Sequence, residues 1–216
     1  MQKVYIVGGN GFARECYLYL LWMSEMNPDI QFGGFLGHGG YGNTVDYLNL
    51  QEFYLGEVSD HKFNINESVV IGAGYPELRE KIYKELKERN VKMFNLVAPY
   101  VYINPTVEMG EGNVFVAPFT PGPNVKIGNG NVFNGDVVVG HDATIGDFNF
   151  FGGKSQILGG VKVGNSNKIG TASVFLPKSK IGNYNQIAPM SCIYKGCKNK
   201  CYMAGNPALK VGDVEC

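Results

Sequence analysis

Residues 125–146 read VKIGNGNVFNGDVVVGHDATIG, and this stretch contains the pattern that decides the fold. Every sixth residue from Ile127 onward is large and apolar, and this spacing continues without a break to Ile193. Because 44% of the chain is hydrophobic, twelve apolar residues in one fixed register would arise by chance roughly once in 20,000 trials. The second half of the chain is therefore a six-residue repeat.

The positions beside the apolar residue also repeat. Glycine often follows it, and the residue two positions before it is small or medium-sized. These preceding residues are Val125, Asn131, Val137, Ala143, Asn149, Ser155, Val161, Asn167, Ser173, Ser179, Asn185 and Ser191. A unit of six residues can form one short strand and one corner, so stacked units would bury the apolar side chains in a shared interior. Upstream, Ile103, Met109 and Phe115 keep the register, and Pro121 interrupts it once.

The first 95 residues follow a different pattern, in which apolar runs alternate with helical periods. We predict strands at residues 4–7, 30–36 and 68–71 and helices at residues 12–26 and 76–90. In the second helix Leu78, Ile82 and Leu86 share one face, and the charged residues are expected elsewhere on its surface. Strands that alternate with helices indicate a small parallel sheet, so a Rossmann-like α/β domain is expected here.

Charge and composition exclude several classes of partner. The chain has 19 Lys plus Arg and 19 Asp plus Glu, which gives neither a basic footprint for nucleic acid nor a polybasic membrane signal. No apolar stretch approaches the ~20 residues of a membrane span, and the run at 4–7 is too short for a signal peptide. We therefore expect a cytoplasmic protein with no membrane partner. In that compartment its cysteines are expected as free thiols; they are Cys16, Cys192, Cys197, Cys201 and Cys216. The spacing of the three from Cys192 to Cys201 lacks the CxxC pairs of a zinc site.

The repeat contains a single histidine, His141; the other two, His38 and His61, precede it. His141 stands two positions after Val139, which the repeat directs inward, and we expect its side chain to point away from the interior of the stacked units. An imidazole titrates near neutrality, so a histidine exposed on such a repeat can accept a proton from an attacking amine or hydroxyl. Asp142 would orient the ring and stabilise the imidazolium. We therefore predict His141 and Asp142 as a catalytic pair, against the alternative of two adjacent surface residues.

Four segments together resemble a known family, the bacterial sugar acetyltransferases of the hexapeptide-repeat superfamily. Residues 141–148 (HDATIGDF) resemble the His-Asp/Glu signature of its UDP-4-amino-sugar N-acetyltransferases and sialic acid O-acetyltransferases. Residues 7–15 (VGGNGFARE) are similar to the N-terminal loop, 158–164 (LGGVKVG) to a coil that lines the CoA groove, and 204–208 (AGNPA) to the closing turn. The resemblance covers nearly the full chain.

This resemblance implies a left-handed parallel β-helix, a three-sided prism with three hexads per coil, behind the α/β domain. The implied division is 1–95 for sugar binding, 96–200 for the β-helix and 201–216 for a closing turn and tail. It also implies a homotrimer with active sites in the grooves between prisms, and acetyl-CoA as co-substrate without a metal. The residues placed near CoA by the resemblance are Gly159, Gly160, Thr171 and Pro189.

The loop Gly8, Gly9, Asn10 and Gly11 precedes the first predicted helix, where backbone amides can hold phosphate groups. We predict that it binds the sugar substrate, although a tight strand-to-helix turn would leave the same sequence. A dinucleotide enzyme is disfavoured because Arg14 stands where the third glycine of the GxGxxG motif is needed. The preferred acceptor is the amine of a nucleotide-linked amino sugar, and the alternative is a sugar hydroxyl of the sialic acid type.

Three places depart from the family pattern. Phe150 stands where a second histidine often follows the first, and Lys154 interrupts a glycine-rich stretch. Residues 37–40 read GHGG where the UDP-sugar members have paired acidic residues, and the next carboxylate is Asp46. The identity of the nucleotide, and the choice between amine and hydroxyl, therefore stay open.

Two further classes of protein share such a repeat. The γ-type carbonic anhydrases gather three imidazoles on zinc, which one histidine in the repeat does not favour. A non-catalytic binding protein would have much the same composition and remains an alternative.

Overall fold

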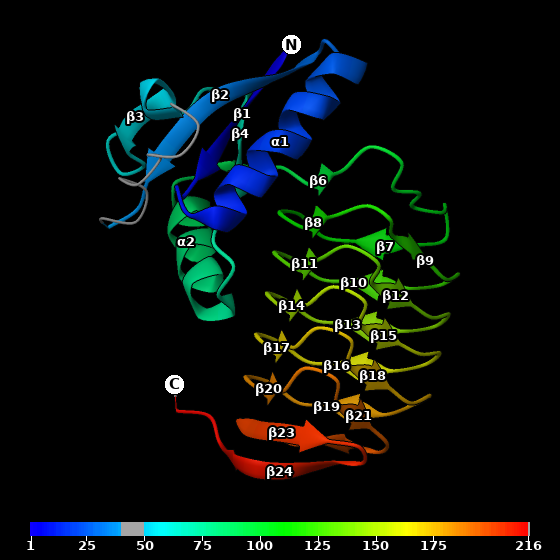
Figure 1. The fold of residues 1–216 in the computed structure, drawn as a ribbon. Helices are drawn as coiled ribbons and strands as arrows, with labels where there is room; N and C mark the ends of the chain where they lie inside the picture. Colours follow the sequence, from blue (N-terminus) through cyan, green and yellow to red (C-terminus); the bar gives the residue numbers. More distant parts are fainter. Residues whose placement is uncertain (40–49, 216) are drawn as a thin grey trace.

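The computed structural model describes residues 1–39 and 50–215, which form an α/β part followed by a prism of stacked coils (Figure 1). The α/β part has a parallel sheet with strand order β3-β2-β1-β4-β5. Its strands are β1 (Gln2–Val7), β2 (Ile30–Gly37), β3 (Tyr54–Glu57), β4 (Glu67–Ile71) and β5 (Lys92–Met93), and the short 3-10 helix η1 (Leu50–Phe53) precedes β3. The three predicted strands are confirmed; β3 and β5 were not predicted, and both are short.

Two helices cover opposite faces of this sheet. Helix α1 (Gly11–Met26) packs on the side of Val4 and Ile6, and helix α2 (Pro76–Glu88) packs on the side of Tyr5 and Val7. Both predicted helices are confirmed. The hydrophobic cluster of α1 also includes residues of the first prism coils, so α1 lies between the sheet and the prism (Figure 1). This packing places the loop that precedes α1 beside the prism.

Three sheets form the sides of the prism, and their strands are parallel except for the last strand in the chain; we name the sheets faces I, II and III. Face I contains β7 (Glu108–Met109), β10 (Lys126–Ile127), β13 (Thr144–Ile145), β16 (Lys162–Val163), β19 (Lys180–Ile181) and β22 (Gly196–Cys197). Face II contains β6 (Leu96–Val97), β8 (Val114–Phe115), β11 (Val132–Phe133), β14 (Phe150–Phe151), β17 (Lys168–Ile169), β20 (Gln186–Ile187), β23 (Cys201–Gly205) and β24 (Ala208–Asp213). Face III contains β9 (Thr120–Pro121), β12 (Val138–Val139), β15 (Gln156–Ile157), β18 (Val174–Phe175) and β21 (Cys192–Ile193).

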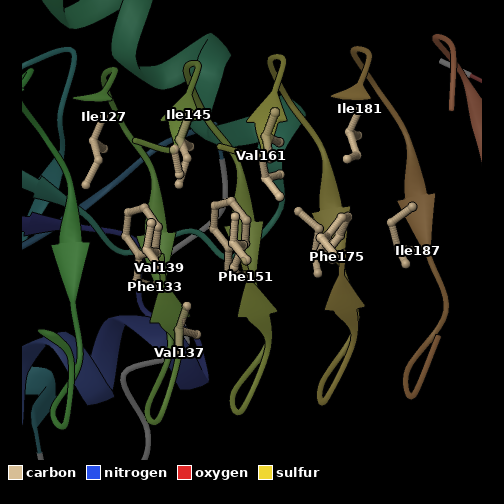
Figure 2. Packing of buried hydrophobic residues seen from close by; sticks show 14 of the residues in the cluster. Ile127, Phe133, Val137, Val139, Ile145, Phe151, Val161, Phe175, Ile181 and Ile187 are labelled. Atoms are coloured by element: carbon tan, nitrogen blue, oxygen red, sulfur yellow. The ribbon is translucent and has the colours of Figure 1, made fainter. Parts of the chain in front are cut away.

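The prism core is built from the predicted apolar positions. Strands 18 residues apart pair in register, as Phe133 does with Phe151, so three hexads complete one coil. All twelve residues of the register from Ile127 to Ile193 are at most 4% exposed, which confirms the repeat. Figure 2 shows several of these side chains on successive coils, and the rings of Phe133 and Phe151 stack with centroids 4.9 Å apart. Met109, at the open end of the prism, is 38% exposed because few coils cover it.

A buried ladder of asparagines runs along the prism inside this core. It contains Asn113, Asn131, Asn149, Asn167 and Asn185, one on each coil. The side-chain oxygen of Asn131 accepts hydrogen bonds from the backbone and side-chain amides of Asn149, and the Asn149 amide also donates to the carbonyl of Gly164 at 2.8 Å. Buried amide groups are costly unless they are paired, so the ladder fixes the stacking register of the coils.

One buried arginine joins the α/β part to the prism. Arg79 on α2 is fully buried, although the sequence predicted charged residues only outside the apolar face of this helix. Its guanidinium donates to the carbonyls of Ile71 and Ala73 on one side and of Gly112 and Gly130 on the other. These four carbonyls satisfy a cation that has no carboxylate partner among residues 1–39 and 50–215, and burial lowers the pKa of Arg79 to about 10. Arg79 therefore stays charged at neutral pH and holds the two parts together.

The last strands close the prism. Strand β23 pairs in parallel with β20, and β24 folds back on β23, so the predicted turn at 204–208 connects two strands of face II. Cys16, Cys192, Cys197 and Cys201 are free thiols, whereas Cys216 lies outside the described residues. Within 1–39 and 50–215, no helix has the length and apolar character needed to cross a membrane.

Candidate active site

The histidine and aspartate predicted as a catalytic pair lie at the corner between β12 and β13, where face III meets face I. Val139 at the end of β12 points inward, and the His141 side chain is 68% exposed on the outside. Asp142 takes the corner position with a φ of 58°, and its Oδ2 lies 2.7 Å from His141 Nδ1. The other carboxylate oxygen, Oδ1, accepts a hydrogen bond from Asn124 Nδ2 at 3.1 Å. Asp142 is thus held between two partners.

These contacts define the protonation of the pair. The hydrogen bond with His141, followed by that with Asn124, holds the pKa of Asp142 below its ordinary value. Asp142 is therefore ionised at neutral pH, and a neutral His141 donates its Nδ1 proton to it. The lone pair of Nε2 then faces away from the carboxylate, so Nε2 can accept a proton from a bound molecule.

Gly159 and Gly160 lie one coil further along the same corner. A Cβ on Gly159 would stand 2.6 Å from Nε2 of His141, so the imidazole ring lies directly over this glycine. Gly160 has a φ of 69°, and the stem of Lys178 from the next coil passes beside it. The structure therefore brings Gly159 and Gly160 together with His141 and Asp142.

Thr171 and Pro189 lie at a different corner, between faces II and III. Both line a cavity of about 330 Å³, which we call the prism cavity. Phe150, Lys168 and Tyr202 on face II contribute to its walls. Within one chain, Thr171 and Pro189 therefore lie at a different corner from His141. A single prism does not bring all the predicted site residues together.

The N-terminal loop borders a second cavity, of about 210 Å³, which we call the loop cavity. Gly8, Gly9 and Asn10 line it, but Gly11 is the first residue of α1 and does not. Gly8 has a φ of 121°, and a Cβ there would lie 3.3 Å from the carbonyl oxygen of Gly72. The glycine is thus needed for the tight turn as well as for the cavity wall.

Sequence analysis missed most of the loop cavity. The other lining residues are Phe12, His38, Gly72, Ala73, Gly74, Tyr75, Leu78 and Ile82. The carboxyl ends of neighbouring parallel strands meet at one edge of a sheet, so the glycines after β4 could have been placed beside those after β1. His38 belongs to segment 37–40, where the sequence departs from the family pattern. Its Nε2 lies 2.6 Å from Glu85 Oε2. Gly40 and Asp46 are outside the described residues.

Phe150, where the family often has a second histidine, joins the two regions. It lines the prism cavity and makes an edge contact with Phe12 of the loop cavity, with ring centroids 6.2 Å apart. Lys154 occupies a left-handed corner position with a φ of 64°. Among residues 1–39 and 50–215, no three His, Cys, Asp or Glu side chains gather where they could hold a metal ion.

Solved structures similar to this chain cover almost its whole length. The acetyltransferase domain of PglB from Neisseria gonorrhoeae matches with a TM-score of 0.83 and 16% identity, over 98% of this chain and all of that one. A perosamine N-acetyltransferase from Caulobacter crescentus, in complex with CoA and GDP-perosamine, matches with a TM-score of 0.85 and 21% identity, over 99% and 98%. WeeI from Acinetobacter baumannii matches with a TM-score of 0.84 and 23% identity, over 98% and 100%.

The fold is that of the left-handed β-helix acetyltransferases. The predicted fold class, an α/β part followed by a left-handed parallel β-helix, is therefore confirmed. Neither a protein-family model nor a curated protein matches the chain.

Proposed function

We propose that the protein transfers the acetyl group of acetyl-CoA to the amine of a nucleotide-linked amino sugar, with His141 as the base. The observation that carries this proposal is the His141–Asp142 pair on a prism corner, where Gly159 leaves room for the exposed imidazole and Nε2 faces away from the carboxylate. Similar solved structures support it, because the Caulobacter crescentus protein is described with CoA and GDP-perosamine and was also solved as two histidine variants. The PglB domain is described with acetyl coenzyme A.

The chemistry follows from the protonation of the pair. The amine nitrogen attacks the thioester carbonyl, and Nε2 of His141 accepts the proton that the nitrogen loses. Asp142 stabilises the resulting imidazolium through Nδ1. Collapse of the tetrahedral intermediate breaks the carbon–sulfur bond, and the CoA thiolate leaves and takes up that proton. The same residues would serve a hydroxyl acceptor, so the acceptor is decided by the substrate pocket.

We further propose that the protein is a homotrimer assembled through face III. The outward residues of face III carry no charge; they are Thr120, Val138, Gln156, Val174 and Cys192. By contrast, the outward positions of face I include Glu108, Lys126, Lys162 and Lys180, and the first coils of face II are covered by α1. Val138 is 47% exposed in the single chain, as expected of a surface that a partner covers.

Such a trimer would complete the site. Face III lies between the two corners described above, so packing three copies of it around an axis sets the corner of His141 against the Thr171 corner of the next subunit. Gly159 and Gly160 of one chain would then lie opposite Thr171 and Pro189 of the other, with CoA between them. The acceptor would reach His141 of the partner subunit from the loop cavity. A cytoplasmic location, where both substrates are made, belongs to the same proposal.

The test is CoA release from acetyl-CoA in the presence of UDP-, GDP- and dTDP-linked amino sugars, free amino sugars and sialic acid. We expect release with a nucleotide-linked amino sugar, and a loss of at least about 100-fold in His141→Ala. Thr144→Ala is the matched control because Thr144 is exposed on the neighbouring strand of face I and touches none of the site. Absence of release from every acceptor, or full activity of His141→Ala, would overturn the proposal. Release with sialic acid alone would assign the hydroxyl reaction.

A further inference from the structure

The loop cavity and the prism cavity meet at one pair of side chains. Tyr75, directly before α2, lines the loop cavity, and Lys168 on β17 lines the prism cavity. Lys168 Nζ lies 4.6 Å from the centroid of the Tyr75 ring, so the pair bridges the α/β part and face II. The two cavities are therefore adjacent parts of one path along this side of the molecule.

Lys168 is electrostatically distinctive on this path. It is the single Lys, Arg, Asp or Glu among the described residues that line either cavity. No carboxylate of the described residues lies within ion-pair distance of its ammonium group, and its neighbours on the outside of face II are Phe150 and Gln186. A half-buried cation without an acidic partner favours binding of an anion. The Tyr75 ring holds the ammonium in place, and the N–H groups that do not face the ring can donate to a ligand.

We propose that Lys168 binds the diphosphate of the nucleotide-linked sugar, which makes it the residue that selects a nucleotide-linked acceptor over a free sugar. This inference rests on the proposed function. A diphosphate connects the nucleoside to the sugar, so it belongs at the junction between a nucleoside cavity and a sugar cavity. The loop cavity has apolar walls at Leu78 and Ile82 that suit a base, and the prism cavity leads to the Thr171 corner where the acetyl group would arrive.

Two sets of groups would then hold the diphosphate from opposite sides. The backbone amides of Gly9 and Asn10, at the start of α1, approach it from the α/β part. Lys168 approaches it from the prism and supplies the full positive charge that the loop lacks. Because these groups come from different parts of the chain, the diphosphate is recognised only when Arg79 keeps the two parts together.

The experiment compares Lys168→Met, Lys168→Arg and Lys162→Met in the full chain. Lys162 is the matched control because it is an exposed lysine of the same prism on face I, outside both cavities. We expect Lys168→Met to raise KM for the nucleotide-linked sugar about tenfold or more, with KM for acetyl-CoA unchanged and with Lys168→Arg between it and wild type. The discrimination between nucleotide-linked and free amino sugar should fall by the same factor. Melting temperatures would confirm that all three variants fold.

Calorimetric titration with UDP, GDP and dTDP separates this inference from the proposed function. If wild type binds one of these nucleotides and Lys168→Met binds it at least about tenfold more weakly, the inference holds even if no acetyl transfer is found. It is overturned if Lys168→Met and Lys162→Met bind nucleotide equally well, if Lys168→Met raises KM for acetyl-CoA instead, or if wild type binds none of the three nucleotides.

Discussion

The imidazole of His141 lies directly over Gly159, whose Cβ, if present, would stand 2.6 Å from Nε2. The atom that accepts the proton is thus positioned by the absence of a side chain one coil away. Any larger residue at position 159 displaces the ring, which can swing aside because it is exposed. A side chain at position 159 would therefore disturb the geometry of the site more than the stability of the fold.

Gly159→Ala should separate activity from stability. We expect kcat to fall about 10- to 100-fold, because Nε2 leaves its place beside the thioester, while the melting temperature changes little. Gly140→Ala is the contrasting variant. Its Cβ would meet the backbone nitrogen of Gly159 at 2.6 Å, and backbone cannot move aside, so it should lose about 1–3 kcal/mol of stability. Equal effects of the two variants on stability would contradict this assignment.

Asp142→Asn tests the role of the carboxylate. We expect kcat to fall about 10- to 100-fold, because an amide neither fixes the Nδ1 proton nor stabilises the imidazolium. The hydrogen bonds of Asp142 hold its pKa below the ordinary 3.8, so it stays ionised as pH falls through the neutral range. Mild acidification should therefore leave the contribution of the carboxylate intact, and that contribution should be lost only below pH 3.8. The pH profiles of kcat/KM for wild type and Asn124→Ala provide the comparison.

Arg79→Met should destabilise the junction between the two parts of the molecule. Methionine fills a similar volume but leaves the carbonyls of Ile71, Gly112 and Gly130 buried without a donor. We expect a loss of about 3–5 kcal/mol, measured by denaturant unfolding, and earlier proteolysis of the α/β part. Arg89→Met is the control, since Arg89 donates only to the carbonyls of Val58 and His61 within the α/β part. Separate unfolding of the two parts should appear in Arg79→Met alone.

The sequence predicted those features of the fold that repeat. A six-residue period fixes which side chains point inward, and it placed His141 two positions after Val139, on the outside. With three hexads in each coil, the same period also assigns each residue to one of the three corners of the prism. Gly159 lies one full coil after His141 and shares its corner, whereas Thr171 lies 30 residues after it, which is one coil and two faces further.

The junction between the α/β part and the prism could not be predicted, because it depends on contacts between segments that are distant in the sequence. The carbonyls that hold Arg79 belong to segments up to 51 residues away and leave no mark in the helix that carries it. The Tyr75–Lys168 pair joins residues from different parts of the chain in the same way. Such contacts can be predicted only when the positions of the α/β sheet and of face II relative to each other are known.

Lys178 should contribute to acetyl-CoA binding through its charge. From residue 148 to residue 212 the sequence has nine lysines and no acidic residue, so the C-terminal coils attract the phosphates of CoA. Lys178 lies on the His141 corner, with its stem beside Gly160. We expect Lys178→Glu to raise KM for acetyl-CoA about threefold to tenfold at low salt, with a smaller effect at high salt. Lys162→Glu, on the outside of face I, should change it less.

Mixed trimers test whether two subunits form each site. In the proposed arrangement, Lys168 of one subunit faces His141 of the partner subunit, so the two residues act on one substrate from different chains. Chains with His141→Ala and chains with Lys168→Met, coexpressed in equal amounts, should therefore form some sites in which both residues are intact. Random assembly predicts that about a quarter of the sites are of this kind.

The measurement is acetyl transfer at a nucleotide-sugar concentration too low for Lys168→Met alone. The coexpressed chains should recover up to about a quarter of wild-type activity, and the double variant mixed with wild type serves as the reference for intact sites. Val138→Lys on face III should abolish this recovery, because three like charges would meet at the axis and keep the chains apart. Thr144→Lys on face I should not. Recovery no greater than that of the separate variants would mean that each chain supplies both residues to its own site.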